Sequence, residues 1–262
     1  MRFALGIEYA GDDFHGWQSQ ADGRGVQDAV ERGLSFVADA PIRCVAAGRT
    51  DTGVHATSQI VHFDVDADRP LTAWVRGVNS ALPPAVAVLW AQPVAAGFHA
   101  RFAATARHYT YLLQNRAVRP ALSGTRAGWY HRPLDNEAMA NAMTHLIGTH
   151  DFSSFRAAEC QARSPVKTLA VASVRRCGDW LRFDFSADGF LHHMIRNIVG
   201  ALVVVGSGRA RPEWLAELVA LRDRTRAAPT FAAGGLYFAG ADYASVWDLP
   251  ATRRDLPPLP AG

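Results

Sequence analysis

The segment best suited to chemistry is residues 48–56, with the sequence GRTDTGVHA. It holds one carboxylate, Asp51, two residues after the guanidinium of Arg49, with glycines at positions 48 and 53. Such glycines let a backbone turn sharply and approach a ligand closely. A carboxylate beside an arginine stays ionised and oriented, as a nucleophile or an electrostatic anchor must. Two interpretations remain open: an active-site loop, or a polar turn in which Asp51 caps the next segment and Arg49 is solvated.

Aromatic and basic residues elsewhere could accompany this loop. Tyr109 and Tyr111 alternate in a strand-like segment, so both rings project from one face, either into a core or toward an unpaired base. Arg196 opens an apolar helix, and a buried arginine left without a carboxylate costs about 3–5 kcal/mol. Asp51 is an available partner for it. Further arginines stand among small and aromatic residues and could hold phosphates or be solvated: Arg101, Arg107, Arg156 and Arg163.

The charge is divided unevenly along the chain. Residues 1–105 have 8 basic against 11 acidic residues, a net charge of −3. Residues 106–262 have 19 against 13, a net charge of +6. A basic half favours a polyanionic partner such as nucleic acid. However, Lys167 is the only lysine among 27 basic residues, and codon bias would give the same skew.

Several other chemistries are excluded by their missing motifs. The histidines show no metal-ligand spacing, and no dinucleotide fingerprint, Walker loop or GxSxG elbow occurs. Asp51 has no second acid in a comparable setting, which argues against two-carboxylate hydrolysis. The three cysteines lie far apart, no apolar run has membrane-spanning length, and an early acid argues against a secretory signal. We therefore expect chemistry without a metal or cofactor, in the cytoplasm.

Apolar periodicity divides the chain into strands and helices. Strands are predicted at residues 2–9, 42–47, 59–65, 85–90, 98–114, 166–175, 180–186 and 236–243. Helices are predicted at residues 26–38, 71–81, 136–147, 192–205 and 212–222. Hairpins and long loops favour an α+β fold with a largely antiparallel sheet over a doubly wound parallel one. A Pro-rich tail after residue 243 is expected to be irregular.

Each half of the chain offers the split βαβ elements of a ferredoxin-like (RRM-like) unit. We expect two domains that share one central sheet, with the active site in the groove between them. Residues 1–105 would carry the Asp51 loop, and residues 106–262 would carry Tyr109 and Arg196.

Six strings, in chain order, point to one family: GRTDTGVHA, FHARF, ARHYTY, DFSSFR, FLHHMIRNIVG and GLYF. In order and approximate spacing they resemble the TruA-type tRNA pseudouridine synthases, from about residue 3 to about residue 248. The resemblance implies the pseudouridine synthase fold and gives Asp51 the role of catalytic nucleophile. By the same match, Tyr109 packs on the target base, and Arg49 and Arg196 are active-site arginines. Thr52 stands at a variable position, and no catalytic position departs from the pattern.

The resemblance also implies a reaction and a substrate. The expected enzyme is an isomerase that converts uridine to pseudouridine at positions 38, 39 and 40 of the tRNA anticodon stem-loop. It would work as a homodimer and need no cofactor, because isomerisation adds and removes nothing. Asp51 could attack carbon 1′ of the ribose or carbon 6 of the ring, and the resemblance does not choose between them. An ionised aspartate, with a reference pKa of about 3.9, needs no activation at neutral pH. Two alternatives remain, a non-catalytic RNA-binding module on the same scaffold and a glycosidase-like hydrolase.

Overall fold

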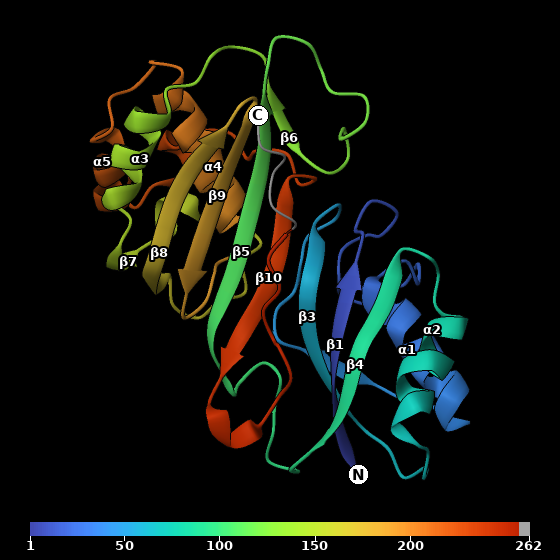
Figure 1. Ribbon diagram of the computed structural model, residues 1–262. Coiled ribbons are helices and arrows are strands. Elements are labelled where there is room, and N and C mark those ends of the chain that lie inside the picture. Colours follow the sequence, from blue (N-terminus) through green and yellow to red (C-terminus); the bar gives the residue numbers. More distant parts are fainter. Residues whose placement is uncertain (257–262) are drawn as a thin grey trace. The chain divides into compact units, whose positions relative to one another are not determined.

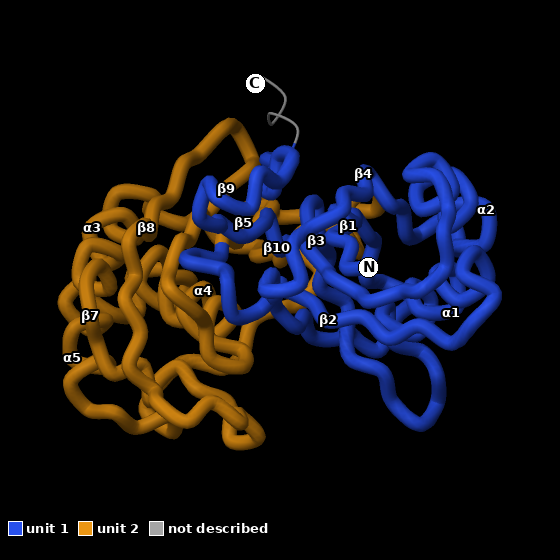
Figure 2. The backbone as a smooth tube through the Cα atoms, turned by 90° about the horizontal axis from the view of Figure 1, so that it is seen from below, with its two compact units in different colours: residues 1–107, 237–256 blue, residues 108–236, 257–262 orange. Residues whose placement is uncertain are grey.

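The computed structural model describes residues 1–256, which form two compact units (Figure 2). Unit 1 comprises residues 1–107 and 237–256, and unit 2 comprises residues 108–236. The chain leaves unit 1 within strand β5 (Ala104–Asn115) and returns to it at the start of strand β10 (Leu236–Tyr243). The predicted domains, residues 1–105 and 106–262, stay a prediction. Residues 257–262 of the Pro-rich tail lie outside the described part of the chain.

The sheet of unit 1 is built around β1, which is antiparallel to a neighbour on each side (Figure 1). The strand order is β4–β1–β3–β10, with β2 paired to β3. The bounds are β1 (Arg2–Tyr9), β2 (Cys44–Ala46), β3 (His55–Asp64) and β4 (Val86–Val94). β10 runs parallel to β3, with Tyr237 opposite His55. The alternating Phe3, Leu5 and Ile7 of β1 are buried, as the apolar pattern predicts.

The helices of unit 1 pack against this sheet (Figure 1). They are α1 (Val26–Ala38), a π-helical turn η1 (Ala73–Gly77) and α2 (Val78–Ala81), which continues η1. Val26, Val30 and Leu34 of α1 are fully buried, so the predicted amphipathic helix is confirmed. The predicted helix at residues 71–81 is also confirmed. Its Trp74 is fully buried, with its ring 5.2 Å from that of Phe63 on β3.

The sheet of unit 2 has the strand order β5–β9–β8–β7, with β6 parallel to β5. The bounds are β6 (Gly128–Tyr130), β7 (Gly148–Asp151), β8 (Val166–Cys177) and β9 (Trp180–Ala187). β8 and β9 form the predicted antiparallel hairpin. The turn between them contains Gly178 at φ 53°, a left-handed conformation that suits glycine.

The helices of unit 2 also follow the sequence prediction. They are α3 (Asn136–Thr144), α4 (Met194–Gly206) and α5 (Trp214–Leu221), each starting and ending within three residues of its predicted bounds. α3 packs on both α4 and β8. α4 is buried along most of its length, which explains its nearly continuous apolar sequence.

One predicted strand is wrong in its first part. Residues 98–103 form a turn, and the strand begins at Ala104. Phe98 and Ala100 are both fully buried, so the sequence alternates as a strand does. The backbone nevertheless curls, because the N–H of Phe98 bonds to the carbonyl of Ala95 and that of Ala103 to the carbonyl of His99. The short strands β6 and β7 were not predicted at all.

Each unit mixes helices with strands that pair mostly antiparallel, which confirms the α+β class. Within residues 1–256, no helix has both the length and the apolar character needed to cross a membrane.

Candidate functional site

The GRTD loop lies in unit 1 and joins β2 to β3. Arg49 and Thr52 are exposed, Asp51 is half-buried, and Thr50 between them is 7% exposed. Thr50 therefore anchors the loop in the protein while Asp51 retains access to solvent. This arrangement is what a nucleophile needs, because it must be both fixed and reachable.

Three hydrogen bonds join the GRTD loop to neighbouring parts of unit 1. The hydroxyl of Tyr9 lies 2.8 Å from Oγ1 of Thr50, and the N–H of Trp17 donates to the carbonyl of Thr50 at 3.0 Å. Nε2 of Gln59 donates to the carbonyl of Gly48 at 2.7 Å. Burial raises the pKa of Tyr9 to about 12, so its hydroxyl stays neutral. The loop is thus fixed by residues of β1, β3 and the segment after β1.

Glycines of a second loop, residues 10–25, pack directly on the backbone of the GRTD loop. A Cβ atom on Gly16 would lie 2.7 Å from the carbonyl oxygen of Thr50 and 3.1 Å from the carbonyl carbon of Asp51. A Cβ atom on Gly11 would lie 2.1 Å from the carbonyl oxygen of Val54. Only glycine permits such close approach of two backbones. The sequence prediction recognised the glycines inside the motif but missed these two, because the contact joins segments far apart along the chain.

His55 fixes the far end of the motif. Its side chain is 1% exposed, and its Nδ1 accepts a hydrogen bond from the N–H of Gly11 at 2.9 Å. Its Nε2 lies 3.6 Å from a carboxylate oxygen of Asp12, and its ring centroid is 4.8 Å from that of Tyr237. These contacts give His55 a structural role in positioning the loop.

Tyr109 lies on β5, in unit 2, where it is 9% exposed. The ring of Phe190 meets it edge-on, with centroids 5.1 Å apart and planes at 80°. Tyr111, two residues later, is fully buried and donates its hydroxyl to the carbonyl of Ala232 at 2.8 Å. Tyr111 is therefore a core residue, and Tyr109 is the more exposed of the two tyrosines.

Arg196 lies in the first turn of α4, also in unit 2. Its Nε donates to the carbonyl of Phe231 at 2.9 Å, and the N–H of Phe231 donates back to the carbonyl of Arg196 at 3.2 Å. A Cβ atom on Gly200, one turn later, would lie 2.3 Å from the carbonyl oxygen of Pro229. The segment at residues 229–231 therefore packs tightly along α4 and orients the arginine.

Asn197 secures that segment from within the core. It is fully buried, and its Nδ2 donates to the carbonyl of Phe155 at 2.8 Å. Its Oδ1 accepts from Thr230 at 2.7 Å and from Arg224 at 3.1 Å. A buried amide with its hydrogen bonds satisfied on both sides fixes its neighbours. The sequence prediction did not single out Asn197, although a polar residue in an apolar helix was a signal for it.

Two of the arginines considered as phosphate ligands donate hydrogen bonds to backbone carbonyls. One guanidinium nitrogen of Arg156 donates to the carbonyls of Cys160 and Ala162 at 2.7 and 2.9 Å. Arg107 donates to the carbonyls of Arg101 and Ala104. Both side chains brace turns of their own units.

The structure thus places the four predicted site residues in two pairs. Arg49 and Asp51 share one loop of unit 1, and Tyr109 and Arg196 belong to β5 and α4 of unit 2. Each pair is held by a dense local set of hydrogen bonds and ring contacts. A fixed carboxylate with an arginine nearby suits nucleophilic chemistry on an uncharged or anionic substrate.

Known proteins resemble this chain over nearly its full length. The family model described as tRNA pseudouridine synthase matches residues 7–103 and 142–244. A tRNA pseudouridine synthase A of Dechloromonas aromatica is 59% identical over 255 residues, covering 97% of each chain. Another, of Thiobacillus denitrificans, is 60% identical over 257 residues, covering 98% of this chain and 99% of the relative. Among solved structures, the crystal structure of a Cbf5-Nop10-Gar1 complex aligns with 90% of this chain and 48% of its own, at a TM-score of 0.39 and 7% identity, too weak a likeness to carry an argument.

The resemblance inferred from six short motifs is confirmed, and with it the pseudouridine synthase fold and the isomerase class. The chain belongs to the tRNA pseudouridine synthase family.

Proposed function

We propose that this chain isomerises uridine to pseudouridine at positions 38, 39 and 40 of the tRNA anticodon stem-loop, with Asp51 as the nucleophile. The observation that carries the proposal is the GRTD loop, in which buried Thr50 is held by Tyr9 and Trp17 while the adjacent Asp51 reaches solvent. The name that the relatives share, tRNA pseudouridine synthase A, supports tRNA as the substrate.

The reaction balances without any added group. The bond between N1 of uracil and carbon 1′ of the ribose breaks, the base turns over, and carbon 5 bonds to carbon 1′. Carbon 5 then loses its proton, and N1 gains one. The carboxylate of Asp51 attacks either carbon 1′, from which carbon 5 displaces it as the new bond forms, or carbon 6, from which it is eliminated once the new bond is complete. No metal or cofactor is part of this proposal.

The other predicted residues would act on the target base and on Asp51. Tyr109 would stack on the target base, and stacking worth about 1–3 kcal/mol would offset much of the few kcal/mol that removing a base from a stem costs. Arg49 and Arg196 would position Asp51 and fill the space that the extruded base leaves. We further propose a homodimer acting in the cytoplasm, in line with the sequence prediction.

The decisive experiment measures tritium release from tRNA that carries tritium on carbon 5 of its uridines. The wild-type protein should release tritium, and Asp51→Asn should release none while still binding tRNA. Asp68→Asn, a change at an exposed aspartate of unit 1, is the matched control and should behave as wild type. Full activity in Asp51→Asn would refute the role of Asp51.

The same assay separates the alternatives. A non-catalytic RNA-binding module would bind tRNA and release no tritium even as wild type. A glycosidase-like hydrolase would produce free uracil, which chromatography detects. Mapping pseudouridines in the treated tRNA tests positions 38, 39 and 40 individually.

A further inference from the structure

The turn at residues 98–103 presents an aromatic ring that the proposed chemistry does not use. Phe102, at the end of the FHARF string, is 76% exposed. Phe98, at the start of the same string, is fully buried, with its ring 5.3 Å from those of Tyr243 and Trp247. One phenylalanine therefore anchors the turn in unit 1, and the other is held out to solvent.

The backbone under Phe102 is fixed. Nδ1 of His99 accepts hydrogen bonds from the N–H groups of Arg101 and Phe102, both at 3.2 Å. From the other side, Arg107 donates to the carbonyls of Arg101 and Ala104. The exposure of Phe102 is therefore a consequence of a well-defined turn and not of a loose loop.

The ring of Phe102 is also supported. The ring of His99 stacks on it with centroids 4.3 Å apart and planes at 29°. The ring of His62, which is 5% exposed, lies 4.7 Å from that of His99. The guanidinium carbon of Arg101 lies 5.6 Å from the centroid of Phe102. These residues hold the exposed ring of Phe102 between the stacked ring of His99 and a guanidinium that lies over the Phe102 ring.

We propose that Arg101 and Phe102, supported by His99, form a stacking site for an unpaired base of the RNA substrate. The base would stack on Phe102, and Arg101 would pair with an adjacent phosphate. Stacking on a side-chain ring tolerates any base, because every base has a π face. The guanidinium of Arg101, an exposed residue of this turn, complements a phosphate backbone. The proposal rests on the proposed function only for the choice of RNA as the ligand.

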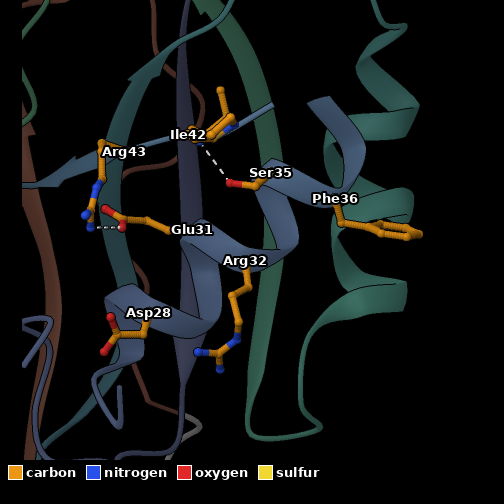
Figure 3. A pocket seen from close by; sticks show the side chains of 8 residues that line it. Asp28, Glu31, Arg32, Ser35, Phe36, Ile42 and Arg43 are labelled. Carbon is orange, nitrogen blue, oxygen red and sulfur yellow. Dashed lines mark hydrogen bonds and ion pairs between the residues drawn. The ribbon is translucent and has the colours of Figure 1, made fainter. Parts of the chain in front are cut away.

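Phe36 offers a matched comparison, since it is 71% exposed and belongs to the same unit. It stands on α1 at the rim of a shallow pocket and points away from the other lining residues (Figure 3). That pocket carries both signs of charge, and Glu31 and Arg43 form an ion pair at 2.8 Å across it. Within residues 1–256, no aromatic ring stacks on Phe36. An exposed phenylalanine alone is thus not the feature that we propose as the site.

The test measures binding of tRNA in the Asp51→Asn background, so that affinity is measured apart from catalysis. Phe102→Ala should raise the Kd for tRNA about tenfold, and Phe102→Leu, which also lacks an aromatic ring, should raise it by the same factor. Phe102→Trp keeps a ring and should have a Kd within about twofold of the parent. Phe36→Ala should leave the Kd unchanged. In the active protein, Phe102→Ala should raise KM with little change in kcat.

A second variant gives an independent measurement should Phe102→Ala unfold more easily than the parent. Arg101→Gln should reduce the slope of log Kd against log salt concentration by about one phosphate contact.

Unchanged Kd values in both Phe102→Ala and Arg101→Gln would overturn the proposal, as would a Phe102→Leu variant that binds like the parent. A change in oligomeric state with unchanged RNA affinity would instead assign Phe102 to a contact between copies of the chain. Tritium release by the wild-type protein is scored separately, so a failure of the proposed reaction is distinguished from a failure of the stacking site.

Discussion

The hydroxyl of Tyr9, at the end of β1, lies 2.8 Å from Oγ1 of Thr50 in the loop that carries Asp51. Both side chains are buried, at 4% and 7% exposure. A strand of the central core thereby fixes the residue next to the proposed nucleophile. The consequences of this contact can be measured.

Replacing Tyr9 with phenylalanine removes the hydroxyl and keeps the ring. Thr50 then loses a buried partner, so we expect the free energy of unfolding to fall by about 1–3 kcal/mol. The kcat for tritium release should fall about tenfold, because Asp51 is held less firmly. Urea denaturation and the tritium assay measure the two effects. Tyr130→Phe, on β6, is the control, and a normal kcat in Tyr9→Phe would contradict a positioning role.

Gly16→Ala should damage the GRTD loop through two effects. Gly16 has φ 83°, which strains alanine, and the new Cβ atom would meet the carbonyl oxygen of Thr50 at 2.7 Å. Gly23→Ala separates these effects, since Gly23 has φ 65° and a Cβ atom there would meet nothing of residues 1–256 within 4 Å. We expect both variants to lose stability by about 1–2 kcal/mol from φ alone. Only Gly16→Ala should also lose most of its kcat, and equal kcat values in the two variants would disprove the contact's importance.

His62 should make the stability of the protein depend on pH. Burial, together with the charges of His99 and Arg2, lowers its pKa to about 4, against the opposing effect of Asp64. The unfolded chain takes up a proton near pH 6.5, whereas the folded protein does so only near pH 4. The part of the free energy of unfolding that is linked to His62 is therefore fully present above pH 6.5. It declines by on the order of 2 kcal/mol as the pH falls toward 4.

His62→Asn is the variant that tests this pH dependence, because its amide oxygen can still accept the N–H of Ala100, which bonds to Nδ1 of His62 at 3.1 Å. Urea midpoints between pH 7 and pH 4 should fall less steeply in His62→Asn than in the wild type. Parallel curves would exclude His62 as the titrating group. Asp64 and Asp151 have pKa values below the ordinary 3.8, so their contributions are lost only at lower pH and do not overlap this window.

Asn197→Ala should destabilise the protein by about 2–4 kcal/mol, since it leaves the carbonyl of Phe155 and the side chains of Thr230 and Arg224 without their buried partner. Thermal unfolding measures this loss. Asn141→Ala, at an exposed position of α3, should change stability by less than about 0.5 kcal/mol. If Asn197→Ala lowered stability no more than Asn141→Ala does, the amide of Asn197 would not be what holds residues 229–231 against α4.

The sequence by itself determined the local elements and the family. β1, α1 and β10 lie at the predicted residues, because apolar periodicity reports directly which face of a segment is buried. The six motifs sufficed to recognise the family, since their order along the chain is a property of the sequence. The roles of Asp51, Arg49, Tyr109 and Arg196 follow from that resemblance and stay predictions for experiment.

Only the tertiary structure decided how the motif is held. The contacts of Gly11 and Gly16 with the GRTD backbone join segments that are far apart along the chain, and no local pattern encodes such a contact. The pairing of β6 with β5 could not be predicted either, because the three residues of β6 carry too little periodicity to indicate a strand. At residues 98–103 an alternating pattern concealed a turn, because alternate burial of Phe98 and Ala100 satisfies either backbone path. The exposure of the Phe102 ring follows from that turn and could not be predicted from the sequence pattern.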